Sequence, residues 1–590
     1  MTILAGPTRE LPDLRAHEVF EAQARARPNA VAAVHGSRRL TYGELNARAN
    51  RLARALVARR LACEAVVGVM TERNLDWLTA VLAIFKAGAA YLPIEPQFPA
   101  ERVAKMLSRS GAKLVLTAAA IDAGCRESES DENLGIAVAP NQLAYIYFTS
   151  GSTGEPKGAM CEHAGLLNHL LAKIDDLRIG EGTVVAQTAP QCFDISLWQL
   201  LAALLVGGRT LLVEQETILD ANRFLDRITG AEANIVQVVP SYLEVLVSSL
   251  EQQPRALDRL EYVVATGEAL KKELVERWFR VQPRIKLVNA YGLTETSDDT
   301  NHEIMDRPPH GERVPLGRPI NNVVIHIVDE HMQPVPPGEA GEIVFSGVCV
   351  GRGYINDPER TARAFLPDPM HAGERLYKSG DYGRALPDGK LEFLGRRDSQ
   401  VKISGFRIEI GEIENAFVRL PGVGAAAVIV HNEQLVAFYV ADQPLDAASM
   451  SQKLRERLPA YMVPASFHWQ RSLPLTDNGK TNRKALSALA TELALGEQTR
   501  EAPSTAHERW LAAAWADVLG IAAEQIGRRD QFFELGGTSL TALKLAIALD
   551  RAVSFKDLTT HPQLADLAAL LDKRGIRTAP QPVPSGTCGT

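Results

Sequence analysis

The stretch LAYIYFTSGSTGEPKG, residues 143–158, joins an apolar run to a loop of hydroxyl side chains and glycines that ends at Lys157. Glycines let backbone N–H groups approach phosphate oxygens, hydroxyls add hydrogen-bond donors, and a lysine adds a point charge. The loop is not a Walker A loop, because Pro156 precedes Lys157 and Gly158 follows it. An ordinary surface turn is the alternative, but eight patterned residues in a row favour a cradle for a triphosphate.

The sequence on both sides of this loop alternates between short apolar runs and amphipathic segments. Apolar runs at 65–70 and 234–239 suit buried parallel strands. Residues 42–59 place leucine and alanine at helical spacing after Thr41, which suits a helix N-cap. This alternation predicts a large α/β core over residues 1–394.

Four shorter regions follow this core. Dense charge with a shorter hydrophobic period predicts a small α+β subdomain at 395–490. The polar, proline-bearing stretch at 491–504 is typical of a linker. Residues 505–575 contain three segments with apolar residues at i, i+3 and i+4, which predict a small all-α helical bundle. The tail at 576–590 has proline, glycine and serine but no apolar core, so we expect it to be disordered.

The composition argues against several classes of function. Of 590 residues, 64 are Lys or Arg and 71 are Asp or Glu, which gives a net charge of −7; a nucleic-acid or anionic-membrane partner would favour a basic surface. Six scattered cysteines without a CxxC pair argue against a disulfide framework and a zinc site. No run is long and apolar enough to span a bilayer. We therefore expect a cytoplasmic protein with reduced thiols, no nucleic-acid partner and no membrane partner.

Ten segments resemble, in order along the chain, the adenylation domains of nonribosomal peptide synthetases, within the adenylate-forming enzymes that include acyl-CoA synthetases and luciferases. The resemblance implies a large core of several α/β subdomains with a small mobile C-terminal subdomain. FFELGGTSL (532–540) resembles the attachment motif of a peptidyl carrier, or thiolation, domain. The ten segments are LTYGEL (40–45), KAGAAYLPIEP (86–96), the loop above, FDIS (193–196), NAYGLTET (289–296), GEIVFSGVCVGRGY (341–354), YKSGDYGR (377–384), GRRDSQVKISGFRIEIGEIE (395–414), LPAYMVP (458–464) and LTDNGKTNRKAL (475–486).

The resemblance gives the matched residues roles in binding ATP and Mg²⁺. Asp381 would accept hydrogen bonds from the ribose hydroxyls, and Tyr291 would stack on adenine. Thr294 and Glu295 would meet the α-phosphate and its Mg²⁺, which prefers oxygen ligands. Lys480 would lie between the substrate carboxylate and the ribose and complete the catalytic group. The other nucleotide-binding positions that the resemblance implies are Thr149, Ser150, Gly151, Ser152, Thr153, Gly154, Lys157, Asn289, Ala290, Gly292 and Arg396.

Members of the family run two half-reactions, adenylation and then transfer of the acyl group to a thiol. The resemblance implies that the small subdomain rotates about a hinge at Asp398, which removes Lys480 and brings Gly405 to the pantetheine tunnel. Ser539 is the implied attachment point for 4′-phosphopantetheine, at a helix start where N–H groups favour a phosphodiester. A turn cap is the alternative for Asp398, and an ordinary N-cap serine is the alternative for Ser539.

The family's pocket positions would choose the amino acid. Asp194 would pair with the α-ammonium group, and Asp298 and Asp299 would select a cationic side chain, because carboxylates buried without partners are costly. We expect a basic amino acid, with 2,4-diaminobutyrate first and ornithine second. A neutral polar substrate is the alternative, if one aspartate points outward or bonds to the backbone. The pocket positions are Asp194, Ile195, Trp198, Gln237, Val264, Thr266, Ala290, Asp298 and Asp299, with Lys480 closing the site.

The resemblance as a whole predicts a stand-alone adenylation–thiolation didomain, an ATP-dependent amino acid ligase that loads its own carrier in natural-product biosynthesis. The implied partners are a phosphopantetheinyl transferase, a separate condensation or tailoring enzyme and, as in some relatives, a small MbtH-like activator. Leu293 stands where the family usually has proline, and Thr538 where it usually has histidine or aspartate, which bears on partner recognition. Two alternatives stay open, an acyl- or aryl-CoA ligase of the same fold and a non-enzymatic carrier or scaffold with an inactive nucleotide site.

Overall fold

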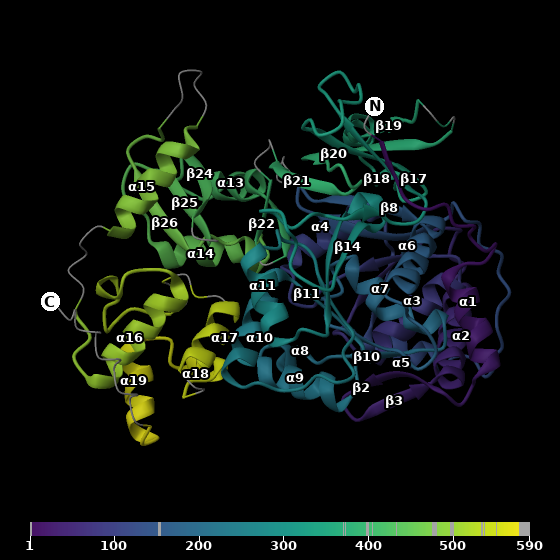
Figure 1. Cartoon of the computed structure of the whole chain (residues 1–590), viewed down its shortest axis with the longest axis horizontal. Helices are drawn as coiled ribbons and strands as arrows, with labels where there is room; N and C mark the ends of the chain where they lie inside the picture. Colours follow the sequence, from purple (N-terminus) through teal and green to yellow (C-terminus); the bar gives the residue numbers. More distant parts are fainter. Residues whose placement is uncertain are drawn as a thin grey trace. The chain divides into compact units, whose positions relative to one another are not determined.

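The computed structural model divides the chain into two units (Figure 1). The first comprises Met1–Leu420 and Ser451–Val463, and the second comprises Pro421–Met450 and Pro464–Thr590. The expected boundary between 394 and 395 stays a prediction, and nearly all of the expected disordered tail lies outside the described residues. The structure describes residues 3–151, 155–369, 371, 373–396, 400–403, 405–431, 434–474, 481–495, 501–532, 535, 537, 539–549 and 552–576.

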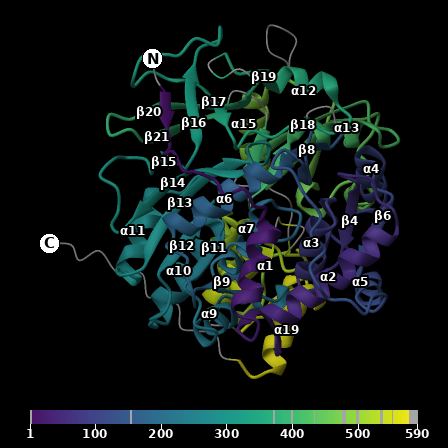
Figure 2. The same cartoon turned by 90° about the vertical axis from the view of Figure 1, so that its right-hand side faces the viewer.

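The largest sheet of the first unit has nine strands, in the order β15-β14-β13-β12-β11-β9-β10-β2-β3. Its middle strands run parallel, and Figure 2 shows β11 to β14 beside one another. The predicted apolar run at 234–239 contains β11, which is buried at every position. β14 pairs antiparallel with β13, with a bulge between Tyr291 and Gly292. The strands are β2 (Val31–His35), β3 (Arg38–Thr41), β9 (Val184–Gln187), β10 (Arg209–Leu212), β11 (Ile235–Val238), β12 (Tyr262–Ala265), β13 (Lys286–Leu293), β14 (Asp298–Met305) and β15 (Arg318–Pro319).

A second sheet, in the order β18-β8-β7-β5-β4-β6, carries the hydroxyl- and glycine-rich loop. β7 and β8 pair antiparallel, and the loop joins them, so Thr149 at the end of β7 lies opposite Lys157 at the start of β8. The predicted apolar run at 65–70 forms β4. The strands are β4 (Val66–Met70), β5 (Ala90–Pro93), β6 (Leu114–Thr117), β7 (Leu143–Thr149), β8 (Lys157–Glu162) and β18 (Gly353–Tyr354).

A third, antiparallel sheet has the order β1-β16-β17-β20-β19, with β21 paired to β20. Its register places Asp381 on β20 opposite Arg396 on β21. The two-stranded hairpin β22–β23 follows it in the chain. The strands are β1 (Ile3–Ala5), β16 (Val323–Val328), β17 (Gly341–Gly347), β19 (Phe365–Pro367), β20 (Arg375–Ala385), β21 (Leu391–Arg396), β22 (Gln400–Ile403) and β23 (Phe406–Glu409).

Several helices of the first unit begin at a side-chain cap, and α2 is one of them. Thr41 caps α2 as predicted, because its hydroxyl accepts the Glu44 N–H while the Glu44 carboxylate accepts the Thr41 N–H. α3 is buried at every position except Asp76 and packs on α2. The helical segments are α1 (Ala16–Ala26), α2 (Tyr42–Ala58), α3 (Leu75–Lys86), α4 (Ala100–Ser110), α5 (Ala118–Gly124), α6 (His163–Asp176), α7 (Ile195–Leu201), η1 (Ala203–Leu205), α8 (Gln215–Ile218), α9 (Ala221–Gly230), α10 (Pro240–Gln252), α11 (Lys272–Val281), η2 (Thr294–Thr296), α12 (Pro358–Ala364), α13 (Ile410–Val418) and η3 (Ala460–Met462).

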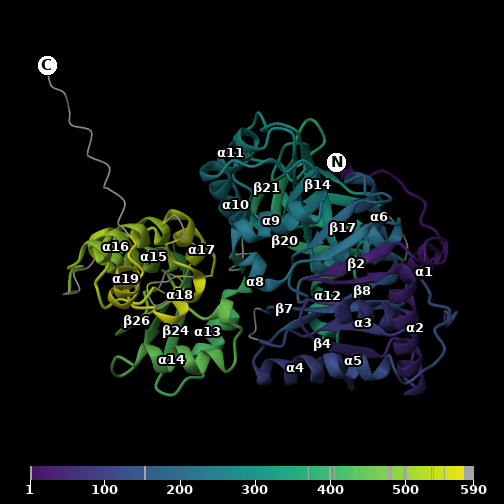
Figure 3. The ribbon, with the colours of Figure 1, turned by 90° about the horizontal axis from the view of Figure 1, so that it is seen from below.

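The second unit contains a three-stranded sheet, β24-β25-β26, and a helical bundle (Figure 3). Trp515 and Phe532 lie at the centre of the bundle core, and their rings are 5.2 Å apart. The sequence predicted three helices here, whereas the described part of the bundle adds α18, a six-residue helix capped by Ser554 that is too short to show a period. The elements are β24 (Ala425–His431), β25 (Gln434–Val440), α14 (Ala447–Arg455), which crosses into the first unit, β26 (Ser466–Gln470), α15 (Arg483–Leu495), α16 (Ala506–Leu519), η4 (Ala523–Gln525), α17 (Ser539–Ala548), α18 (Phe555–Thr560) and α19 (Leu564–Lys573).

Together these elements confirm the predicted α/β core, the smaller α+β region and the all-α bundle. Among the helices that the structure describes, none has the length and apolar character needed to cross a membrane.

Candidate active site

Lys157 and Glu295, which the resemblance assigns to the nucleotide and its Mg²⁺, form an ion pair beside the glycine-rich loop. Lys157 Nζ lies 3.2 Å from Glu295 Oε1, and the Glu295 side chain has no exposed surface. The Glu295 carboxylate also accepts hydrogen bonds from Tyr354 Oη at 2.8 Å and from Arg407 Nη1 at 2.7 Å. Burial opposes its ionisation, but Arg407 and Lys157 outweigh burial and hold the pKa of Glu295 well below its usual range. The site therefore contains an ionised carboxylate between two cations.

Glu295 also fits the Mg²⁺ that the resemblance implies. Proteins usually hold Mg²⁺ through one or two carboxylates together with substrate phosphates, and Glu295 is one buried, ionised carboxylate. Thr149, which pairs with Lys157 across the hairpin, has a buried hydroxyl without a hydrogen-bond partner among the described residues. Because Arg407 bonds the second Glu295 oxygen, Arg407 and Mg²⁺ would compete for this carboxylate.

The start of the glycine-rich loop is bonded to β23 and α13. Ser150 Oγ donates to Arg407 O at 2.7 Å and accepts from Glu409 N at 3.0 Å. Gly151 N donates to Glu412 Oε2 at 3.1 Å, and Arg102 Nη1 lies 3.0 Å from Glu412 Oε1. The Ser150 hydroxyl and the Gly151 N–H are thus already engaged, although the sequence assigned both to phosphate.

The residues predicted to hold adenosine come together from β13, β20 and β21. Tyr291 Oη donates to Asp381 Oδ2 at 2.6 Å, and Arg396 forms an ion pair with Asp381 Oδ1. Asp381 is 2% exposed, so its carboxylate is held by two neighbours rather than by water. Tyr291 and Asp381 are 90 positions apart in the sequence, so this meeting is a product of the fold.

Three further residues that the resemblance assigns to the nucleotide, Asn289, Ala290 and Gly292, lie on β13, which pairs with β14. Asn289 donates its side-chain N–H to Pro315 O at 2.8 Å, which fixes the strand rather than a ligand. Ala290 lies next to it in the core. A β-carbon at Gly292 would lie 2.0 Å from Asp298 O, so the bulge requires glycine there.

The predicted pocket positions are linked to one another by hydrogen bonds. Trp198 Nε1 donates to Gln237 Oε1 at 2.7 Å. Thr266 Oγ1 lies 3.0 Å from Ala290 O and 3.3 Å from Asp299 Oδ1. These contacts join α7, β11, β12, β13 and β14 into one wall. The hydrophobic cluster at this wall includes Trp198, Val264 and Ala290, with Ile195 packed against it.

Asp194 forms no ion pair with any residue that the structure describes. It caps α7, and its Oδ1 accepts the Ile195 N–H at 2.9 Å. Burial raises the pKa of Asp194, and the Thr294 hydroxyl offsets only part of that effect. No lysine or arginine in the described part of the chain forms an ion pair with it. A ligand cation beside Asp194 would therefore favour its ionised form.

Asp299 differs from expectation, because it already has a partner within the protein. Lys173 Nζ lies 2.6 Å from Asp299 Oδ2, and the two side chains are 0% and 2% exposed. Burial opposes ionisation of Asp299, but the ammonium group of Lys173 outweighs burial and lowers the pKa of Asp299. Lys173 Nζ also lies 4.8 Å from the centre of the Trp198 ring. Lys173 thus contacts two predicted pocket positions, and the sequence analysis did not identify it.

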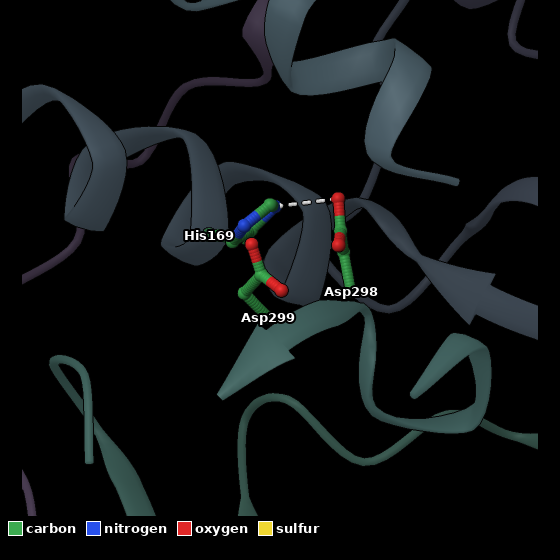
Figure 4. A group of neighbouring side chains, drawn as sticks. All are labelled: His169, Asp298 and Asp299. Carbon is green, nitrogen blue, oxygen red and sulfur yellow. Dashed lines mark ion pairs between the residues drawn. The ribbon is translucent and has the colours of Figure 1, made fainter. Parts of the chain in front are cut away.

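Asp298 has no lysine or arginine partner in the part of the chain that the structure describes. Figure 4 shows His169, Asp298 and Asp299 converging, with His169 Nδ1 3.5 Å from Asp298 Oδ2. Burial and the neighbouring Asp299 carboxylate raise the pKa of Asp298, and burial lowers the pKa of His169, which leaves its imidazole neutral. Asp298 Oδ2 is buried without a hydrogen-bond partner among the described residues. His169 and Lys173 are polar residues four positions apart among the apolar residues of α6, and this spacing is the feature of the sequence that could have indicated a polar cluster here.

Gly405 lies at the turn of the β22–β23 hairpin, near the end of β11. Its N–H donates to Glu268 Oε1 at 2.9 Å, and an added β-carbon would lie 2.6 Å from Val239 Cγ1. The adjacent Phe406 ring lies 4.9 Å from the Phe193 ring. Ser539 is the first residue of α17. The predicted residues outside the described part of the chain are Ser152, Thr153, Gly154, Asp398, Lys480 and Thr538.

Family models match three successive parts of the chain. The model described as AMP-binding enzyme matches residues 20–355, the AMP-binding enzyme C-terminal domain matches 412–480, and the phosphopantetheine attachment site matches 509–571. The order is that of the predicted core, smaller subdomain and carrier bundle.

Curated relatives include tyrocidine synthase 1 from Brevibacillus parabrevis, 36% identical over 595 residues, and bacitracin synthase 2 from Bacillus licheniformis, 36% identical over 584 residues. These alignments cover 97% and 94% of this chain, but 54% and 22% of the relatives. The chain thus spans about half or less of their length.

Among solved structures, holo-PA1221, an NRPS protein containing adenylation and PCP domains bound to a vinylsulfonamide inhibitor, has a TM-score of 0.79 and 27% identity. The match covers 95% of this chain and 96% of that one. The predicted fold class is therefore confirmed for both the core and the carrier. The chain belongs to the AMP-binding enzyme family, in the arrangement of nonribosomal peptide synthetases that places an adenylation domain before a phosphopantetheine carrier domain.

Proposed function

We propose that the chain activates an amino acid with ATP as aminoacyl-AMP and then passes the aminoacyl group to its own carrier at Ser539. The observation that carries this proposal is two buried pairs, Lys157 with Glu295 and Tyr291 with Asp381. Lys157, Glu295 and Tyr291 lie within the region 20–355 that matches AMP-binding enzymes. These residues would supply a cation for the phosphates, a carboxylate for the metal ion and a hydrogen-bond acceptor for the ribose hydroxyls.

The chemistry follows from the charges at this site. In the first half-reaction the substrate carboxylate attacks the α-phosphorus and pyrophosphate leaves, so negative charge must be stabilised. Lys157 supplies a fixed cation beside the loop, and Asp381 with Tyr291 orients the ribose. Mg²⁺ on Glu295 would neutralise phosphate charge. Lys480, outside the described residues, is proposed to neutralise the substrate carboxylate.

The second half-reaction needs a thiol, which phosphopantetheine supplies when it is attached to Ser539. Gly405, beside Val239 at the end of β11, is proposed to line the channel by which this thiol reaches the pocket. A phosphopantetheinyl transferase and a separate condensation or tailoring enzyme are the proposed partners. A small MbtH-like activator is a further candidate for such an adenylation domain.

The proposed substrate is a basic amino acid, with 2,4-diaminobutyrate and ornithine as first candidates. Asp194 would receive the α-ammonium group. Among the described residues, Asp298 is the other pocket carboxylate without a lysine or arginine partner, and a buried carboxylate of this kind favours a cationic ligand group. A pocket with this charge would reject neutral and acidic side chains.

ATP–pyrophosphate exchange with the purified chain tests both parts of this proposal. A panel containing the proteinogenic amino acids, 2,4-diaminobutyrate and ornithine should give its strongest exchange with the basic members. Strong exchange with neutral amino acids alone would reject the substrate class, and no exchange with any member would reject adenylation itself. A CoA ligase is disfavoured by the carrier domain, and treatment with a phosphopantetheinyl transferase followed by intact-mass measurement distinguishes the two, since a CoA ligase gains no mass.

A further inference from the structure

Helix α6 brings a lysine into the wall of the substrate pocket. Lys173 Nζ is 2.6 Å from Asp299 Oδ2 and 4.8 Å from the centre of the Trp198 ring. Both partners are pocket positions, and the Lys173 side chain has no exposed surface. An ammonium group in such a place must be held by charge and by the aromatic face, because water does not reach it.

Lys173 is surrounded by two aspartates of the pocket and two histidines. Lys173 and Asp299 cancel each other, and the low pKa values of His169 and His302 leave both imidazoles neutral. His302 Nδ1 is hydrogen-bonded to Asp176 at 2.7 Å, on the outer side of the cluster. Asp298 is left with a neutral imidazole 3.5 Å away and one oxygen without a hydrogen-bond partner among the residues described. Lys173 thus neutralises Asp299 but not Asp298, and among the described residues the Asp298 carboxyl group has no lysine or arginine partner.

We propose that Lys173 determines which of the two aspartates selects the substrate: it neutralises Asp299 from within the protein and so leaves Asp298 to receive the cationic side chain of the substrate. This inference rests on the proposed function, and it deepens that function by assigning different roles to two adjacent aspartates. Asp299 is the counter-ion of Lys173, and Asp298 is the group that selects a substrate with a cationic side chain.

The backbone supports this division of roles. Asp298 has a φ of +86°, a left-handed conformation that non-glycine residues adopt at a cost. Its side chain is nonetheless buried beside His169 rather than turned towards water. Asp299 instead places both oxygens on internal partners, Thr266 and Lys173.

A bound metal ion is the other occupant that the side chains would suit. His169, Asp298 and Asp299 each place one ligand atom within 4.8 Å of the others (Figure 4). Lys173 argues against a metal, because its ammonium group already occupies the cationic position at Asp299 Oδ2. A substrate ammonium at Asp298 needs no such displacement.

The test compares each cationic amino acid with its neutral isostere in ATP–pyrophosphate exchange, 2,4-diaminobutyrate against norvaline and ornithine against norleucine. The wild-type chain should prefer the cationic member. Asp298→Asn should lower the ratio of kcat/KM values by about a hundredfold or more, because a buried ammonium loses its counter-charge. The charge-neutral pair Lys173→Met/Asp299→Asn should keep the ratio within about fivefold, because Asp298 and the net charge of the pocket are retained.

The outcomes separate this inference from the proposed function. A wild-type chain that prefers the neutral isosteres overturns the substrate class and the inference with it. A wild-type preference for cations that survives Asp298→Asn, or that the double variant abolishes, overturns the inference alone. A rise in unfolding temperature with ATP shows that each variant is folded, so a lost preference is not mistaken for lost structure.

Discussion

Gly405 offers a way to slow one half-reaction while sparing the other. Its φ is +80°, and an added β-carbon would lie 2.6 Å from Val239 Cγ1. In Gly405→Ala the left-handed conformation costs about 1–2 kcal/mol, and the overpacked contact costs about 1–3 kcal/mol more. The strain accompanies the hairpin wherever it lies, so the arrangement seen here would lose only the cost of the overpacked contact, about 1–3 kcal/mol, relative to arrangements in which this hairpin lies elsewhere.

A cost in the middle of this range is enough to measure. Because each 1.36 kcal/mol is a factor of ten, a loss of about 2 kcal/mol lowers the equilibrium constant for forming this arrangement about thirtyfold. If this arrangement serves the thiol, transfer of labelled amino acid to the phosphopantetheinylated carrier should slow by at least about tenfold. ATP–pyrophosphate exchange should change little, because it does not need the hairpin in this place.

Gly338→Ala is the matched control. Gly338 has a φ of +86°, but no heavy atom lies within 4 Å of an added β-carbon, so this variant introduces the strain without the clash. It should leave both half-reactions close to wild type. Equal slowing of exchange and loading in Gly405→Ala, or normal loading, would refute the assignment of this hairpin to the second half-reaction.

Three further outcomes are expected. Asp381→Asn should raise the KM for ATP in the exchange assay by about tenfold, because the buried acceptor beside Tyr291 loses its charge; an unchanged KM would contradict a ribose contact. Ser539→Ala should gain no mass with a phosphopantetheinyl transferase, whereas the wild type gains one group; modification of the variant would place the site elsewhere. Arg528 lowers the pKa of Glu508 to about 2, so the stability that this pair gives the bundle is complete above the unfolded-state pKa of about 4.5 and is lost as the pH falls towards 2. Glu508→Gln should flatten that dependence of the unfolding temperature on pH, and a profile identical to wild type would contradict it.

The fold class and the candidate nucleotide site could be predicted because each depends on a pattern of residues that are neighbours in the sequence. The strands carry continuous apolar runs, and the loop before Lys157 has its own composition. The resemblance assigned Tyr291 to adenine and Asp381 to the ribose, and these assignments stay predictions; in the structure the two side chains are hydrogen-bonded to each other.

The role of Lys173 as the partner of Asp299 could not be predicted from local sequence patterns. Lys173 lies on α6, 126 positions before Asp299, and only the packing of α6 against β14 brings the two together. The predicted pocket positions therefore overstate the negative charge there. They include both Asp298 and Asp299 but omit Lys173, whose ammonium group neutralises Asp299. The extra helix α18 was missed for a simpler reason, because six residues are too few to show a helical period.

One short segment explains why the arrangement described here does not suit ATP. Within β23 and α13, Arg407 bonds Glu295, Glu409 bonds the Ser150 hydroxyl, and Glu412 bonds the Gly151 N–H. Each of these contacts occupies a group that the proposed function assigns to a triphosphate or its metal ion. If Glu295, Ser150 and Gly151 serve the nucleotide as proposed, ATP binding breaks all three contacts, and the same displacement would carry Gly405 away from Val239. Gly405→Ala weakens the contacts of this segment without touching the nucleotide groups, which is why its effect should fall on the half-reaction that follows the release of pyrophosphate.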